Sequence, residues 1–146
     1  MIPFEHKAFV KKLRDFIGDR QELNKLLDDE ENTDNFLYDC ILDALNSINT
    51  EFSPDTTYKI AQVPWQTLKN GAVLQYLIGK GILSARNTLT YNDATNITVQ
   101  DEDTYGRYLT YYNALFNKFN VSVTAWKMRK NIDECYGGEP SEFWYR

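Results

Sequence analysis

The chain has 146 residues and a mass of 17.1 kDa, which suits a single domain that buries roughly 68% of its unfolded surface. Hydrophobic residues make up 42% and charged residues 25% of the sequence, a balance that excludes a disordered tail and a membrane protein. The formal net charge of -5, without a basic stripe, argues against binding of nucleic acid through its phosphates.

Two amphipathic helices are predicted in the first third of the chain. The first covers residues 4–17 and ends at Gly18, a residue typical of helix C-termini. The second covers residues 33–50, with Asn32 or Thr33 as its N-cap. Its apolar side chains trace one continuous stripe, made of Phe36, Leu37, Cys40, Ile41, Ala44, Leu45 and Ile48.

A third helix is predicted over about residues 64–84. The stretch before it, residues 56–63, is either a short strand or an extended linker. The helix is apolar around much of its circumference, which is typical of a central helix. Gly71, Gly79 and Gly81 lie within it, and glycines in such places often permit close packing against a neighbour.

A small β-hairpin over residues 88–99 is predicted to precede a fourth helix, which runs from near Asp101 to about residue 132. A straight helix of that length would be roughly 48 Å long, too long for the other three to cover. We therefore expect part of it to project, or the helix to kink near the β-branched residues 121–124.

These elements together predict a mainly α fold, a small bundle of about four helices with a short hairpin before a long C-terminal helix. Residues 1–136 are expected to form one helical domain, and residues 137–146 an extended aromatic tail. A Gly-Gly hinge leads there into Phe143, Trp144 and Tyr145. Either this tail packs back on its own core, or its aromatic residues bind a partner subunit.

The candidate partner-binding residues are aromatic and basic side chains of the last helix together with the tail aromatics. They are Tyr112, Trp126, Arg129, Lys130, Phe143, Trp144 and Tyr145. The basic residues have a second interpretation, because Lys127, Arg129 and Lys130 also suit the negative end of a helix dipole.

The sequence offers few residues for catalysis or for metal binding. His6 is the only histidine, which excludes a multi-histidine zinc site and argues against a His-dependent triad. Cys40 and Cys135 are far apart, a pattern that suits a reducing compartment. There is no nucleophile motif and no phosphate-binding loop, and the N-terminus lacks the apolar run of a signal peptide or membrane anchor. No enzyme activity, metal or cofactor is predicted.

The order of the parts resembles a known family. A short N-terminal helix is followed by the segment ILDALNSIN (residues 41–49), by a central helix with Gly and Ala, and by the segment YNDATNITV (residues 91–99). A long Tyr-rich helix over residues 101–130 opens with acidic residues and ends in Lys and Arg. This series is similar to the small all-α head–tail connector (adaptor) proteins of tailed bacteriophages, over most of residues 8–130.

The resemblance implies a structural virion protein of the neck, made in the host cytoplasm and without catalysis. Such a protein docks in a ring, commonly of twelve copies, between the portal protein and the tail-completion proteins. The ring extends the DNA channel, and DNA only passes through. The acidic residues Asp28, Asp29, Glu30 and Glu31 would then face the channel and let DNA slide. Their other interpretation is a helix start with a solvated loop.

Three other functions fit the same sequence pattern. One alternative is a tail or baseplate subunit of the virion. Another is a small helical adaptor or inhibitor that binds a host protein through its aromatic tail. A hydrolase that uses a pair of the carboxylates is the remaining alternative.

Overall fold

The computed structural model describes residues 2–22, 30–86, 91–92, 98–99 and 104–135, with side chains placed for 2–22, 30–83 and 106–133. The protein is mainly helical, as predicted. In chain order its elements are α1 (Phe4–Ile17), α2 (Asp34–Thr50), the short 3-10 helix η1 (Ile60–Gln62), α3 (Trp65–Arg86), β1 (Tyr91–Asn92), β2 (Thr98–Val99) and α4 (Thr104–Cys135).

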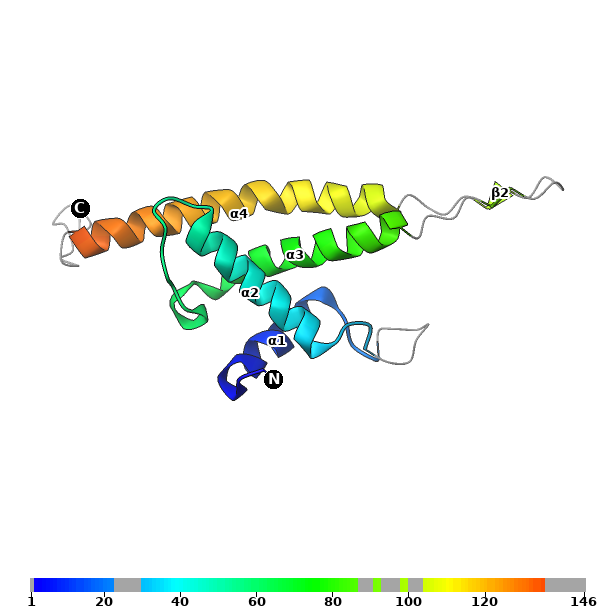
Figure 1. Ribbon diagram of the computed structural model, residues 1–146, viewed down its shortest axis with the longest axis horizontal. Coiled ribbons are helices and arrows are strands. Elements are labelled where there is room, and N and C mark those ends of the chain that lie inside the picture. Colours follow the sequence, from blue (N-terminus) through cyan, green and yellow to red (C-terminus); the bar gives the residue numbers. More distant parts are fainter. Residues whose placement is uncertain (1, 23–29, 87–90, 93–97, 100–103, 136–146) are drawn as a thin grey trace, which may run out of the picture.

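The long helices α3 and α4 form an antiparallel hairpin, with α2 packed across α3 and α1 beyond α2 (Figure 1). The strands between α3 and α4 pair antiparallel, with Tyr91 opposite Val99 and Asn92 opposite Thr98. The predicted bundle, with a short hairpin before a long C-terminal helix, is therefore the observed fold.

The ends of α1 and α2 follow from local sequence. Gly18 adopts the left-handed conformation (φ 74°), and its N–H donates to the carbonyl of Arg14, which is how glycine ends a helix. The hydroxyl of Thr33 accepts a hydrogen bond from the N–H of Phe36 at 3.3 Å. Of the two predicted caps, Thr33 is thus the N-cap of α2.

The stretch over residues 56–63 is a linker, and the alternative of a strand is wrong. Asn49 of α2 satisfies its backbone: the Asn49 carbonyl accepts from the N–H of Thr56, and the Asn49 side-chain oxygen accepts from the N–H of Tyr58, both at 2.9 Å. The chain then turns through η1 before Pro64 leads into α3. Because Asn49 accepts the hydrogen bonds of these backbone N–H groups, they require no partner strand.

The core lies where α2, α3 and the middle of α4 meet, and α1 covers one side of it. Its fully buried apolar side chains include Leu13, Leu37, Ile41, Ala44, Ile48, Leu68, Ala72 and Val123. The α2 stripe read from the sequence supplies half of these, which is why an amphipathic pattern was a sound guide there.

At Gly71, helix α3 lies very close to both α2 and α4. A Cβ placed there would lie 2.7 Å from Cε2 of Phe119 in α4 and 2.9 Å from Cβ of Ala44 in α2. Such distances are too short for real carbon atoms, so only glycine allows the three helices to meet here. The prediction that a glycine of α3 permits close packing is confirmed at this position.

A buried ion-pair cluster joins α1 to the start of α2. The guanidinium of Arg14 lies 2.9 Å from a carboxylate oxygen of Asp19 and 2.9 Å from one of Asp34, and it also donates to the carbonyl of Asn32 at 2.7 Å. Asp19 in turn accepts hydrogen bonds from the backbone N–H groups of Glu31 and Asn32. With Arg14 and Asp19 both buried, removal of either partner would leave an uncompensated charge in the interior.

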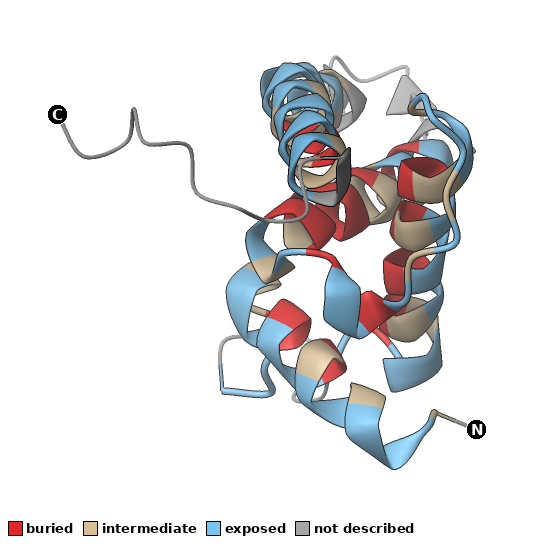
Figure 2. Ribbon diagram, turned by 90° about the vertical axis from the view of Figure 1, so that its left-hand side faces the viewer, coloured by how far each residue is buried: buried red, intermediate tan, exposed pale blue. Residues whose placement is uncertain are grey.

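Helix α4 runs unbroken from Thr104 to Cys135. Of the two expected ways to accommodate its length the structure shows projection, because the last turns of α4 extend past the other elements (Figure 1). Figure 2, which looks nearly along α4, shows its buried residues on the side that faces the other helices. Among the described residues of α4 these are Phe119, Val123 and Lys127.

Candidate partner-binding surface

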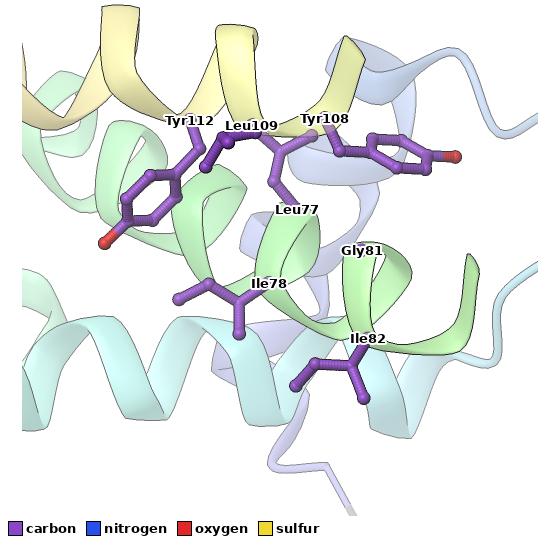
Figure 3. A pocket seen from close by; sticks show the side chains of 7 residues that line it. All are labelled: Leu77, Ile78, Gly81, Ile82, Tyr108, Leu109 and Tyr112. Carbon is purple, nitrogen blue, oxygen red and sulfur yellow. The ribbon is translucent and has the colours of Figure 1, made fainter. Parts of the chain in front are cut away.

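An apolar groove lies between the second half of α3 and the first half of α4 (Figure 3). Its cavity measures about 180 Å³. The lining residues, which are apolar or aromatic except for one glycine, are Leu77, Ile78, Gly81, Ile82, Tyr108, Leu109 and Tyr112. We call this feature the α3–α4 groove.

The side chains at the edges of the α3–α4 groove are open to solvent. Ile82 is 57% exposed, Leu109 45% and Ile78 39%. Apolar residues gathered at an open groove are typical of a binding surface.

A second hollow continues from the α3–α4 groove toward the core, and the two share Ile78 and Tyr112. It has a volume of about 400 Å³. Phe116 lies at its edge, 41% exposed and stacked on Tyr112 with 5.5 Å between ring centroids. Tyr112 thus lines both hollows, and Phe116 lines only the second.

Of the predicted partner-binding residues, Tyr112 lies at the α3–α4 groove and Trp126 does not. Trp126 is half-buried, with its ring 4.9 Å from that of Tyr58 between centroids. Fourteen residues separate it from Tyr112, about 21 Å along the helix. Arg129 is exposed beyond Trp126 and Lys130 is half-buried, so these residues belong to a different part of α4.

The tail aromatics Phe143, Trp144 and Tyr145 lie outside the described residues, as do Asp28 and Asp29 of the acidic run. Glu30 and Glu31 are described, and each forms an ion pair. A carboxylate oxygen of Glu30 lies 3.1 Å from Nη1 of Arg14, and the carboxylate of Glu31 accepts a hydrogen bond from the ammonium group of Lys80 in α3. Both side chains therefore help to fasten the start of α2 to its neighbours.

Lys127 has a different role from the one its sequence position indicates. It lies two turns before the end of α4, is only 2% exposed, and donates hydrogen bonds to the carbonyls of Phe52 and Pro54. Desolvation by burial lowers its pKa. Its interaction with the helix dipole is thus secondary, because its ammonium group holds the loop that follows α2.

Two other buried groups have shifted pKa values. Burial raises the pKa of the Cys40 thiol to about 11, and the nearby Asp43 and Asp39 add to that shift. Burial also raises the pKa of Tyr76 to about 12, with the Glu31 carboxylate as the next cause. Cys40 is thus a protonated core residue at neutral pH and not a thiolate nucleophile.

The groove residues that sequence reasoning missed as a binding site are Ile78, Ile82 and Leu109. A signal was present, because α3 carries more apolar residues than one buried stripe requires. The sequence does not show which of the surplus residues a neighbouring helix covers.

In the part of the chain that the structure describes, no three side chains of His, Cys, Asp or Glu gather as a metal site would require. Among the same residues, no helix combines the length and the apolar character needed to cross a membrane.

No protein-family model, no curated protein and no solved structure matches the chain.

Proposed function

We propose that this protein is a structural virion protein, a head–tail connector that docks in a ring between the portal and the tail of a bacteriophage and continues the DNA channel. The observation that carries the proposal is the α3–α4 hairpin, which presents an apolar groove and exposed apolar side chains that the described chain does not cover. A subunit of an assembly would bury such a surface against its neighbours.

The long helix α4 supports the same proposal. Its exposed apolar residues are distributed from one end to the other, at Leu109, Phe116, Val121, Met128 and Ile132. A helix that projects and is apolar on more than one side gains burial only from contact with other chains. The order of the elements, which resembles that of the connector family, adds the specific position in the virion.

The charged residues that the structure describes also suit a structural role. Arg14 and Asp19 form a buried ion pair, the exposed Asp34 also pairs with Arg14, and Lys127 donates to backbone carbonyls. In each case the charge has a partner whose loss would destabilise the fold. Their arrangement supports a stable building unit.

The proposal also assigns a role in the DNA channel, in which Asp28, Asp29, Glu30 and Glu31 face the passing DNA. Glu30 and Glu31 remain 52% and 46% exposed at their side chains despite their ion pairs, so they still contribute negative potential at the surface. Reversal of Asp28 and Asp29 to Lys tests this role and leaves the ion pairs of Glu30 and Glu31 in place. We expect slower DNA packaging or ejection, and unchanged rates would contradict the channel role.

The proposal is tested by affinity purification from the native source with the tagged full-length chain as bait, followed by mass spectrometry. We expect recovery of a portal or a tail-completion protein and stoichiometric presence of the chain in particles. A second bait, with Phe143, Trp144 and Tyr145 changed to Ala, measures how far the tail contributes.

The other functions correspond to different outcomes of the same experiment. Recovery of tail or baseplate proteins without a portal would move the chain to another place in the virion. Recovery of only a host enzyme or regulator, with no chain in particles, would overturn the connector and favour a host-protein inhibitor.

A further inference from the structure

We propose that the α3–α4 groove binds the aromatic tail segment, residues 143–145, of a second copy of this chain. The inference rests on the proposed function, since it names the contact that joins neighbouring copies in the ring. It is carried by the size and chemistry of the groove and by the length of chain between the groove and the tail.

The groove has the right size and surface for one aromatic ring. Its cavity of about 180 Å³ has an apolar lining, and a comparable apolar cavity of roughly 150 Å³ is large enough to take up benzene. Leu77 and Gly81 form part of the groove on α3, while Tyr108 and Tyr112 contribute aromatic rings from α4 (Figure 3). An inserted Phe, Trp or Tyr would meet both aliphatic and aromatic neighbours.

The chain cannot readily supply its own tail to this groove. Tyr112, the groove residue nearest to Cys135 along α4, precedes it by 23 residues of continuous helix, a distance of about 35 Å. Tyr145 follows Cys135 by ten residues, and a segment of that length spans at most about 36 Å when fully extended but averages only about 17 Å when it is unconstrained. The tail of the same chain therefore reaches only the edge of the groove, and only when it is fully extended back along α4.

A second copy overcomes this geometric limit. The groove lies toward one end of α4 and the tail follows the other end, so each chain carries both halves of the contact at opposite ends. A contact of this kind is heterologous, and repeated copies close into a ring or continue as a filament. The placement of groove and tail thus agrees with the ring assembly proposed above.

The test measures self-association of the purified full-length chain by sedimentation at concentrations up to about 1 mM, which reaches weak but specific contacts. We expect oligomers of the wild type. The tail variant F143A/W144A/Y145A and the groove variant Leu109→Glu should each associate at least about tenfold more weakly than the wild type, as expected when a central anchor is lost. The control Asn117→Glu changes a polar residue of α4 that is exposed and lies outside the groove, and it should associate as the wild type does.

A mixing experiment separates loss of the contact from loss of the fold. The tail variant keeps a working groove and the groove variant keeps a working tail, so an equimolar mixture should form a complex of two chains and nothing larger. A wild type that stays monomeric throughout, or a tail variant that associates as well as the wild type, would overturn the inference.

The two proposals fail in different ways. Sedimentation of the pure chain needs no virion partner, and the affinity purification needs no self-association. A portal recovered by a chain that does not self-associate would leave the connector function standing and remove the tail contact. If the oligomers depend on the tail but only a host protein is recovered, the tail contact stands and the connector function is removed.

Discussion

The contacts between α3 and α4 differ between Gly71 and the α3–α4 groove. Around Gly71 the helices approach so closely that a single added methyl group would meet Phe119 and Ala44. Around Ile82 and Leu109 the same two helices leave a groove with exposed apolar edges. Ala44 of α2 packs against α3 at Gly71, whereas Ile82 and Leu109 keep about half of their surface exposed. The contacts at Gly71 thus stabilise the fold, and the apolar edge of the groove is available to a partner.

The largest effect should come from one substitution made both in the core and at the groove. Ile41 is fully buried in the core and Ile82 is 57% exposed at the groove. We expect Ile41→Ala to lower the free energy of unfolding by about 2–5 kcal/mol, because it removes buried methyl groups and leaves a cavity. Ile82→Ala should change it by no more than about 0.5 kcal/mol. Urea denaturation measures both, and similar losses at the two positions would contradict the comparison.

The close approach at Gly71 should be the next most sensitive feature. We expect Gly71→Ala to destabilise the fold by about 1–3 kcal/mol through overpacking. Gly79→Ala is the matched control in the same helix, since its Cβ would lie 3.4 Å from the nearest atom of Phe36. There the gain in helix propensity, up to about 1 kcal/mol, should dominate. Thermal unfolding of both variants tests the pair, and equal stability changes would show that the crossing is not tight.

The buried ammonium group of Lys127 should matter more than an exposed one. Lys127→Met keeps most of the apolar stem but removes the donor to the carbonyls of Phe52 and Pro54, so we expect a loss of about 1–3 kcal/mol. Lys118→Met, at an exposed position of α4, should stay within about 0.5 kcal/mol of the wild type. Denaturant titration of the two variants compares them, and an unaffected Lys127→Met would remove the assigned role.

The smallest effect is a dependence on pH at the core. The folded protein holds the pKa of Cys40 at about 11, above the ordinary value of 9.0. The unfolded chain therefore loses this proton first, so the stability contributed by the neutral thiol is present below pH 9 and declines as the pH rises toward 11. Between pH 8 and pH 10 the decline should be about 1 kcal/mol.

Cys40→Ala isolates this contribution. The cavity that the substitution leaves lowers the free energy of unfolding by the same amount at each pH. The part of the pH-dependent decline in stability that is due to the thiol is absent in this variant. Denaturant titrations of the wild type and of Cys40→Ala at the two pH values provide the comparison, and equal slopes in both proteins would show that the thiol does not contribute.

The predicted and observed sites differ for a physical reason. The excess of aromatic residues in α4 predicts that Tyr112 and Trp126 both bind a partner. Tyr112 lines the groove, whereas Trp126 packs on Tyr58. The sequence shows that both positions carry large rings, but the linker after α2 determines which ring is covered.

Local sequence alone determined the helices of this protein, since amphipathic stripes, the cap at Thr33 and the stop at Gly18 depend on neighbours within a few residues. The projection of α4 also followed from its length. Tertiary structure decided which apolar residues remain outside, because the cover of each face depends on where other helices cross it. The burial of Lys127 and the groove at Ile82 and Leu109 both arise from such crossings, so contacts between residues distant in sequence create the surface that we propose for binding.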